Sequence, residues 1–450
     1  MGAVRAGRSG WGRGSLRRLG GRCAGQFAHH DRASQYVRMP RLPRRIGARF
    51  VALVRADFAG VRAGFVALLI SSGGDLVAGV TLGSITGTLA ELPGLLVLVP
   101  AAIGMRGNVF GALGSRLGTQ IHSGTFRLSR RADTLVGQNM AASMLSSISI
   151  SAALAVLAKV LSEAFLGTTM SVVDFMVISV VGAVLSSIVV LALTVAVAAF
   201  CANRDLDLDN VAAPIVTAAG DMVTLPSLFL ATYLVGYRYV TPAIGIVCLA
   251  GAIACAVVGY RARGLPILRR IIVESLPILL LAGIVDILAG MTIEKRFESF
   301  NLYPALLVLV PPFLEDSGSL GAILSARVAT KLHLGTLGAD GRGSWRGVAD
   351  DVVLVFFYAV PVFVFLGLSS SLVAHVVNLR SPGVGYMLAV SLVAGFLATA
   401  ASVIVGYYSA VATYRLGLDP DNHGIPMVTS SLDLFGSLSL ILAIVLLGLG

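Results

Sequence analysis

The chain has 450 residues, of which 56% are hydrophobic and 13% are charged, and its formal net charge is +11. Soluble domains carry about 25% charged residues, so this composition excludes an ordinary water-soluble globule. Apolar runs of about 20 residues, long enough to cross a bilayer as a helix, recur from residue 64 to the end of the chain. The sequence therefore predicts an all-α polytopic membrane protein.

The positive charge is concentrated near the N-terminus. Fourteen arginines lie between Arg5 and Arg62, and the first acidic residue is Asp31. No interleaved aromatic residues or folded module accompany them, so no nucleic-acid partner is expected. We interpret residues 1–62 as a flexible cytoplasmic extension held near anionic lipid. Two alternatives are an organelle transit peptide and a natural start at Met39, which would leave residues 1–38 outside the native protein.

The rest of the chain contains an internal duplication. Residues 91–125 align with residues 302–336 at an offset of 211, and "DLVAGVT" (75–81) aligns with "DILAGMT" (286–292) at the same offset. "DLDNVAAPIVTAAGD" (207–221) aligns with "DPDNHGIPMVTSSLD" (419–433) at an offset of 212. A single inserted residue over so long a match argues against chance similarity.

Hydropathy predicts five spans in each copy and one span between the copies. A unit of five spans ends on the opposite side from its start, so the additional span returns the second copy to the orientation of the first. We therefore predict parallel five-helix repeats at 63–237 and 274–450, joined by a linker at 238–273 that contains a transmembrane helix. The predicted spans are 64–88, 91–113, 138–160, 174–200, 212–236, 241–260, 274–292, 303–326, 350–376, 385–408 and 424–447.

Basic residues in the loops predict the orientation of these spans. More of them fall in loops on the side of the N-terminus than on the other side, so the N-terminus is expected in the cytoplasm and the C-terminus outside. The predicted internal loops hold Arg127, Arg130, Arg131, Arg261, Arg263, Arg269, Arg270, Lys331, Arg342 and Arg346, and the external loops hold Arg238, Lys295, Arg296 and Arg380.

Aspartates in the middle of apolar spans are the strongest functional signal. Asp221 and Asp433 each lie 11 residues after the last residue of an Asp-x-Asp-Asn motif, which places them about 16 Å deep in a core of roughly 30 Å. An ionised acid at that depth costs at least about 2.5 kcal/mol, so each should face a polar cavity or an ion. Asp75 and Asp286 lie at similar depth in the first spans, as further cation ligands or as protonated groups that join helices.

Polar residues precede both fifth spans and predict a cytoplasmic vestibule that attracts cations. They are Asp207, Asp209, Asn210, Asp419, Asp421 and Asn422.

Proline and glycine residues in the second spans predict a break whose freed carbonyl groups face a cation pathway, with close helix packing as the alternative. The residues at these positions are Pro100, Gly104, Gly107, Pro311, Glu315, Asp316 and Gly318. Asn108 offers an amide oxygen to the same pathway. Glu315 and Asp316 stand where the first copy has Gly104 and Met105, so the copies are not equivalent, and Arg106 is a candidate ion-pair partner for either acid.

These motifs resemble the membrane domain of the MgtE magnesium transporters over about 64–237 and 274–450, most specifically in the Asp-Pro-Asp-Asn…Pro-x-Val-Thr…Asp segment. The tandem arrangement is similar to solute carrier family 41 and its prokaryotic two-copy relatives. The resemblance implies a central pore between two five-helix domains, with Asp221 and Asp433 at its magnesium site. One chain would supply both halves and function as a monomer in a prokaryotic plasma membrane, without the regulatory CBS domains of bacterial MgtE.

The expected activity is transport of a divalent cation, above all Mg²⁺. Mg²⁺ keeps its water tightly, and two aspartates with the hydroxyl groups of Thr217 and Thr429 suit a mostly hydrated ion. The absence of a Cys, His and Met cluster argues against softer metals. Mg²⁺ is then a substrate that moves across the lipid bilayer, and no cofactor is expected. Movement coupled to Na⁺ or H⁺ is an alternative to passive flow.

An alternative of another class is an intramembrane aspartyl protease, which also needs buried acids. The stretches "SGGD" (72–75) and "AAGD" (218–221) lack the Gly-x-Gly-Asp pattern of such enzymes. Acids duplicated at equal depth also suit a symmetric pore better than an acid and a base with distinct roles. No catalytic residue is therefore expected.

Overall fold

The computed structural model describes residue 55 and residues 58–129, 131, 133–167, 169–204, 208–337, 345–418 and 423–449. The predicted N-terminal extension thus lies almost wholly outside the described residues. All the regular secondary structure of the described part is helical.

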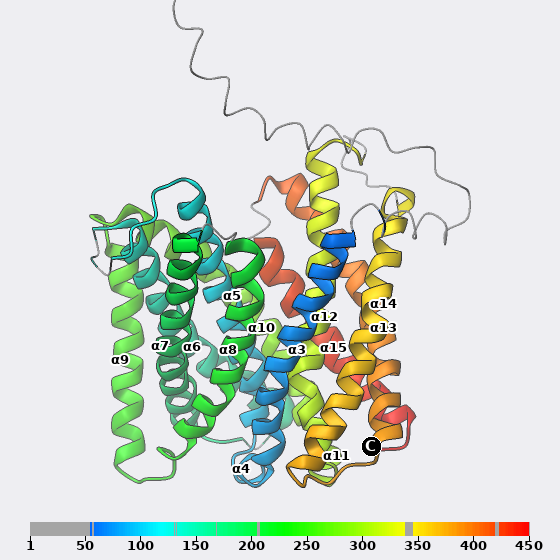
Figure 1. Cartoon of the computed structure of the whole chain (residues 1–450). Helices are drawn as coiled ribbons and strands as arrows, with labels where there is room; N and C mark the ends of the chain where they lie inside the picture. Colours follow the sequence, from blue (N-terminus) through cyan, green and yellow to red (C-terminus); the bar gives the residue numbers. More distant parts are fainter. Residues whose placement is uncertain are drawn as a thin grey trace, which may run out of the picture. The chain divides into compact units, whose positions relative to one another are not determined.

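The helices occur in the same order in both halves of the chain. The first half contains α3 (Phe58–Ser84), α4 (Thr86–Glu91), α5 (Leu95–His122), α6 (Leu135–Leu166), α7 (Val172–Arg204) and α8 (Leu208–Thr232), and α9 (Val240–Arg261) follows. The second half contains α10 (Pro266–Glu294), α11 (Phe297–Leu302), α12 (Ala305–His333), α13 (Trp345–Val376), α14 (Val384–Leu416) and α15 (Ile425–Leu446). Figure 1 shows α4 and α11, which follow α3 and α10, at the same end of the bundle, so the two halves run in parallel.

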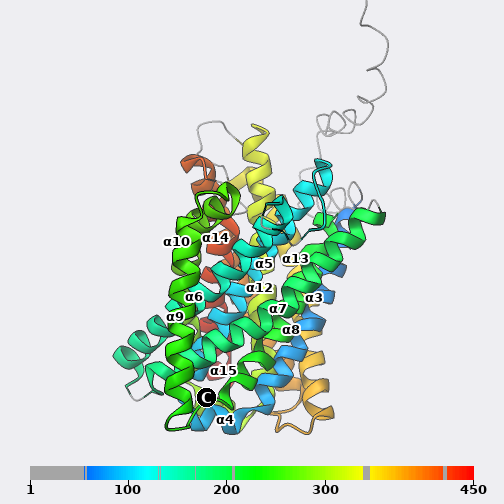
Figure 2. The same ribbon diagram turned by 90° about the vertical axis from the view of Figure 1, so that its left-hand side faces the viewer.

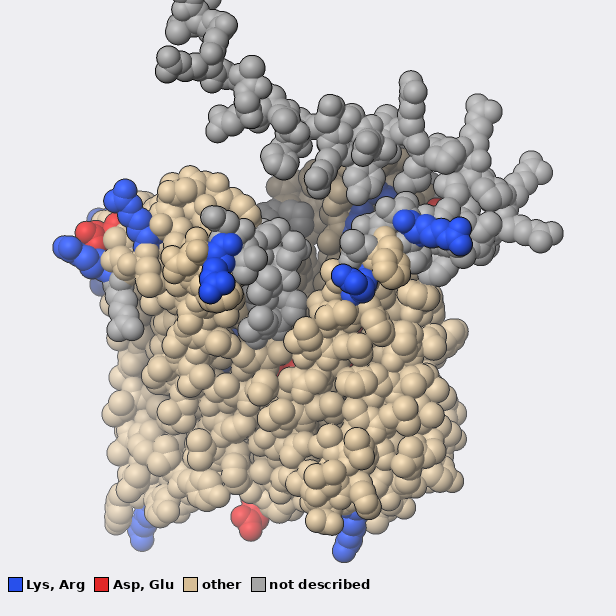
Figure 3. Space-filling model, viewed as in Figure 1, with Lys and Arg blue, Asp and Glu red and all other residues tan. Residues whose placement is uncertain are grey.

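Length and apolarity identify these helices as membrane spans. Ten of the described helices are long and apolar enough to cross a bilayer, and α8 is a helix of 25 residues whose described apolar part is Val216–Thr232. Apart from a small acidic spot near the middle, the charged side chains visible in Figure 3 lie toward the two ends of the bundle. The predicted all-α polytopic fold is therefore confirmed.

The first helix of each half packs against the other half. α3 lies along α12, whereas α10 lies along α5, and each also contacts the fifth helix of its own half. Glycine permits this contact, because a side chain at Gly79 of α3 would overlap the Val308 carbonyl of α12. Gly290 of α10 meets the Val97 carbonyl of α5 in the equivalent way. The halves are therefore interlocked by exchanged helices, which the hydropathy pattern does not predict.

The second helices α5 and α12 occupy the centre of the bundle (Figure 2). In their most apolar stretches 67% and 78% of the residues are buried, against 17% in the linker helix α9, which lies on the outside against α6 and α7. Any polar group on the inner faces of α5 and α12 is therefore shielded from lipid.

The predicted breaks in the second spans are wrong. α5 continues as an α-helix through Pro100, and α12 continues through Pro311 and Pro312. Each proline removes one backbone hydrogen bond, and the helices packed against α5 and α12 hold both helices together despite that loss. The prolines and glycines instead reduce side-chain volume along the helix.

The arginine that matches between the halves has a structural contact with the third helix. Arg116 Nε donates a hydrogen bond of 2.8 Å to Asn139 Oδ1. Its counterpart Arg327 donates one of 2.9 Å to the buried Asp351, which also pairs with Lys331. These contacts lie at one end of α5 and α12 and leave the central faces of both helices free for other groups.

Substitution of Gly79 by valine tests the exchange of helices. The added side chain overlaps the α12 backbone, so we expect a loss of about 3 kcal/mol of folding stability, the upper end of the usual range for overpacking. The measurement is thermal unfolding of the purified protein in detergent. Gly73→Val on the same helix is the control, because a Cβ at Gly73 meets no atom within 4 Å. Equal melting temperatures for the two variants would contradict the contact.

Candidate functional site

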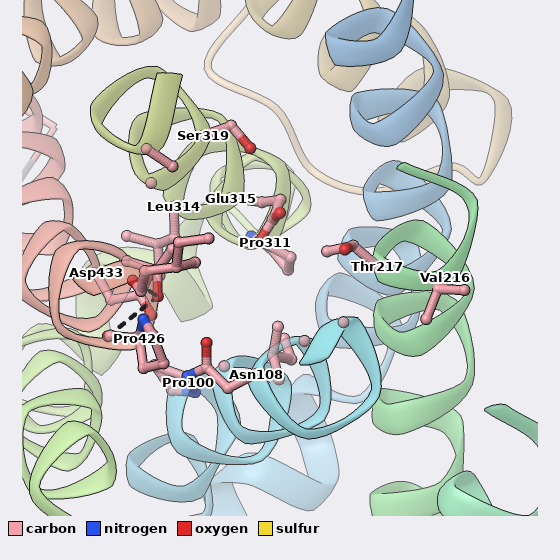
Figure 4. A pocket seen from close by; sticks show the side chains of 18 of the residues that line it. Pro100, Asn108, Val216, Thr217, Pro311, Leu314, Glu315, Ser319, Pro426 and Asp433 are labelled. Carbon is pink, nitrogen blue, oxygen red and sulfur yellow. Dashed lines mark hydrogen bonds between the residues drawn. The ribbon is translucent and has the colours of Figure 1, made fainter. Parts of the chain in front are cut away.

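A cavity of about 520 Å³ lies where the second and fifth helices of the two halves meet. α5 and α12 form most of its wall, and α15 and a short part of α8 complete it. Figure 4 shows Asn108, Thr217, Glu315 and Asp433 around one space, each from a different helix. The polar residues that line the cavity are Asn108, Ser115, Thr217, Glu315, Ser319, Thr429 and Asp433.

The cavity extends along the bundle from the first turn of α15 to the level of Asp433. Its lining begins at Ile425 and Pro426 and ends near Val99 and Val310. Beyond that level, residues 95–98 of α5 and 305–309 of α12 are apolar and at most 2% exposed. The cavity therefore extends toward the end at which α8 and α15 begin, and packed apolar side chains close it at the other end.

Asp286 and Asp433 form a pair of acids beside this cavity. Asp433 lines the cavity and is 9% exposed, whereas Asp286 lies behind it and is 1% exposed. Both reach Gly104 of α5, where a Cβ would lie 2.9 Å from Asp286 Oδ2 and 3.4 Å from Asp433 Oδ2. Ser430 is also adjacent to Asp286, but no donor in the described ranges completes a hydrogen bond to either Asp286 oxygen. A glycine at position 104 thus makes room for both carboxyl groups.

Asp75 and Asp221 form the equivalent pair of the other half. They are neighbours, at 0% and 1% exposed, and neither lines the cavity. Gly74 brings α3 close to Ala218 of α8 and so seals the pair between these helices. Within the described part of the chain, no group outside the pair donates a hydrogen bond to any of its oxygens. Two carboxyl groups at such close range in an apolar setting need a proton or a cation between them.

Two further acids project from α12. Glu315 lines the cavity, and its neighbours include Asp221 and Asp433. Asp316 points toward α3, where the Ser72 hydroxyl donates a hydrogen bond of 2.7 Å to its Oδ2. The two halves therefore place different groups at equivalent positions, because α5 carries Gly104 and Met105 there.

The expected ion pair between Arg106 and these acids is wrong. The Arg106 guanidinium points into the first half, where Nε donates to Ser186 Oγ at 2.8 Å and Nη1 donates to Ser147 Oγ at 3.1 Å. Gly104 and Arg106 are two residues apart, so about 200° of helix rotation directs them to opposite sides of α5. Among described residues, the ion pairs involve Asp133, Glu163, Glu274 and Asp351 and none of the six central acids.

The structure places most of the predicted site residues whose side chains it describes at the cavity, but it separates the aspartates. Asp433 lines the cavity, whereas Asp75, Asp221 and Asp286 lie behind its wall. The other predicted residues in the lining are Pro100, Gly104, Gly107, Asn108, Thr217, Pro311, Glu315, Gly318 and Thr429. Ser115, which no sequence motif singled out, also lines it.

The predicted vestibule lies largely outside the described residues, which include neither Asp207 nor Asp419, Asp421 and Asn422. Asp209 and Asn210 belong to α8, but their side chains are not described.

The donor set of the cavity fits a hydrated hard cation. Its polar atoms are carboxylate, amide and hydroxyl groups, and oxygen ligands are what Mg²⁺ and Ca²⁺ prefer. No three His, Cys, Asp or Glu side chains of the described chain converge on a single metal position. Six water molecules at about 30 Å³ each fill about 180 Å³, so an ion with its water shell fits the cavity volume. Contact through water is therefore possible without a cage of direct ligands.

Comparison with known proteins identifies the family. The family model MgtE, a divalent cation transporter, matches residues 99–231 and 310–443, which are more than half of the chain. The chain belongs to the MgtE family. The matched regions contain most of α5 and α12, with the cavity residues, and most of α8 and α15, with Asp221 and Asp433. The chain is therefore an integral membrane protein of a divalent cation transporter family, as its motifs indicate.

Curated relatives come from solute carrier family 41. Member 3 from Rattus norvegicus is 25% identical over 85% of this chain and 86% of its own length. Member 2 from Xenopus laevis is 25% identical over 83% of this chain and 69% of its own length. Member 2 from Homo sapiens is 24% identical over 84% of this chain and 69% of its own length. No solved structure gives a significant match.

Cysteine labelling tests the cavity. In a background without the native cysteines, we expect Thr429→Cys to react with a small water-soluble maleimide, because Thr429 lines the cavity. Ser430→Cys is the matched control, since Ser430 is 0% exposed and should react only after unfolding. The extent of labelling is read from a gel shift with a polymer-linked maleimide added after denaturation. Equal labelling of both variants in the folded protein would exclude the cavity.

Proposed function

We propose that this protein transports Mg²⁺ through the cavity between its two halves, with Asp433 as an acid that meets the ion. The observation that carries the proposal is the position of Asp433, which lines the cavity at 9% exposed and has carboxyl groups as its charged neighbours. A carboxylate inside an apolar bundle needs water, a proton or a cation. A divalent cation supplies the missing positive charge.

The preference for Mg²⁺ follows from the size and the donors of the cavity. Mg²⁺ gives up its water reluctantly and usually keeps several water ligands. Thr217, Thr429 and Asn108 offer oxygen atoms that accept hydrogen bonds from such water molecules. Direct ligation by thiol, thioether or imidazole groups, which softer metals favour, plays no part in this lining.

The route follows from the shape of the cavity and the distribution of basic residues. We place the end at which α8 and α15 begin in the cytoplasm, because the described arginines of the α5–α6 and α9–α10 connections lie there. The ion then reaches Asp433 from the cytoplasm in this conformation. The buried first turns of α5 and α12 form the opposite gate, and transport requires them to separate.

Asp75 and Asp221 enter this proposal as a second pair of acids. Neither lines the cavity, so the ion meets them only when α8 moves relative to α3. Asp286 acts behind Asp433 and adds negative charge to the same position.

Flux measurements in liposomes test the proposal. We expect Asp433→Asn to reduce Mg²⁺ influx by more than about tenfold, because it removes a full charge next to the ion. Asp221→Asn should also reduce influx, through the second pair. Influx is followed with a Mg²⁺-sensitive dye inside the vesicles, and Ca²⁺, Co²⁺ and Na⁺ are compared in the same way.

The control is Glu298→Gln, which changes an exposed acid in the short helix α11 and should leave influx unchanged. An imposed Na⁺ or proton gradient distinguishes coupled transport from passive flow. Wild-type influx in the double variant of Asp221 and Asp433 would refute the proposed site.

A further inference from the structure

The inner faces of α5 and α12 differ at one pair of equivalent positions, residues 104 and 315. Because the first helices are exchanged, position 104 on α5 faces the pair of Asp286 and Asp433. The equivalent position 315 on α12 is next to the other pair, Asp75 and Asp221. Glycine at position 104 leaves space for carboxyl groups, whereas glutamate at position 315 adds another carboxyl group. The centre of the protein is thus asymmetric in charge.

Glu315 lies within reach of both pairs of acids. Its charge acts on Asp75 and Asp221 on one side and on Asp433 on the other. It also lines the cavity, as does Ser319, which lies one turn further along α12 and next to the Glu315 carboxyl group. Glu315 is therefore close to members of both pairs and also lines the space that an ion enters.

The sealing of Asp221 leaves the cavity without the second aspartate that the repeat predicts. Asp221 is 1% exposed behind the cavity wall, although it matches Asp433 in the alignment of the two halves. Among the described residues of the lining, Glu315 is the other carboxylate. A site built from the groups that line the cavity therefore pairs Asp433 with Glu315 and not with Asp221.

We propose that Glu315 is the second carboxylate of the ion site and that it and Asp433 together bind a hydrated divalent cation. This inference rests on the proposed function of the cavity. Two carboxylates balance the charge of a divalent ion, whereas a monovalent ion leaves one negative charge uncompensated in an apolar bundle. Glu315 is thus a determinant of selectivity for divalent over monovalent cations.

The neighbouring acid on α12 has a different role. Asp316 accepts the hydrogen bond from Ser72 of α3, does not line the cavity and is 0% exposed. It holds α12 against the exchanged helix. Glu315 is one residue earlier, about 100° around the helix, and therefore points toward the cavity. The contact between α3 and α12 thus does not require the Glu315 carboxylate.

The test compares Glu315→Gln and Glu315→Gly with the wild type and with Glu298→Gln. Glu315→Gly recreates the glycine of the other half, and Glu315→Gln preserves the size of the side chain. For both variants we expect the Mg²⁺ concentration that gives half-maximal influx to rise at least about tenfold, which is the effect of one unit charge about 6 Å from a divalent ion even at the dielectric constant of water. Influx of Na⁺ relative to Mg²⁺ should rise in the same variants.

A measurement of binding accompanies the flux assay. Mg²⁺ raises the melting temperature of a protein that binds it in the folded state, and this increase should require about tenfold more Mg²⁺ in Glu315→Gln. Size-exclusion profiles and the melting temperature without Mg²⁺ report on folding, and Glu315→Gln maintains the test if Glu315→Gly does not fold. Glu298→Gln should behave as the wild type in every assay.

The outcomes separate this inference from the proposed function. If the wild type transports Mg²⁺ and Asp433→Asn does not, but Glu315→Gln keeps the wild-type Mg²⁺ dependence and selectivity, then the role of Glu315 is refuted and the cavity remains the route. If the wild type neither binds nor transports Mg²⁺, then the proposed function fails, and the inference fails with it.

Discussion

Carboxyl groups at the centre of an apolar helix bundle, with no basic partner among the described residues, are the constraint on which the rest of this structure depends. A bundle surrounded by lipid cannot solvate such groups, so each must face water, share a proton or hold a cation. The two halves meet this requirement differently. Asp433 faces a cavity, whereas Asp75 and Asp221 are closed against each other between α3 and α8. The cavity and the sealed pair are thus two ways in which the protein accommodates carboxyl groups inside an apolar bundle.

Both arrangements of the acids depend on the exchange of the first helices between the halves. Asp286 reaches its position on α10 only because α10 packs against α5 of the other half, where Gly104 leaves room for it. Asp75 of α3 likewise lies close to α12, because α3 packs against that helix of the other half. A single five-helix unit would therefore leave its pair of acids without the helix of the other half that covers it. The central site exists only when both halves are present, and the linker helix α9 supplies them in the required parallel orientation.

Much of this arrangement could be predicted from the sequence, because it depends on patterns along one dimension. The duplication and the parallel orientation of the halves follow from matched motifs and from the number and length of the apolar runs. The side on which Thr429 lies also follows, since it precedes Asp433 by one helical turn and both residues line the cavity. These features require no knowledge of which helix packs against which.

The remaining features depend on contacts between distant segments. An apolar helix such as α3 has the same hydropathy whichever half it packs against, so its exchange is not visible in the sequence. Proline and glycine can either break a helix or reduce its side-chain volume, and the sequence of α5 allows both outcomes. Only the neighbours that pack against α5 determine that it stays continuous through Pro100. Asp221 and Asp433 occupy equal positions in the repeat and were therefore predicted to act alike. The difference between the surroundings of Asp221 and Asp433 arises on other helices, where position 104 is glycine and position 315 is glutamate.

Fusion of the two halves in one chain is what permits this difference. In a symmetric assembly of identical units every substitution occurs twice, so a glutamate at position 315 would require one at position 104. A side chain at position 104 would begin 2.9 Å from Asp286 Oδ2 and would displace the pair of acids beside the cavity. A symmetric assembly could therefore keep glycine at both positions but could not gain the additional carboxylate at one of them. A fused chain can hold glycine beside one pair of acids and glutamate beside the other, and can therefore change the charge of its central cavity by one carboxylate at a time.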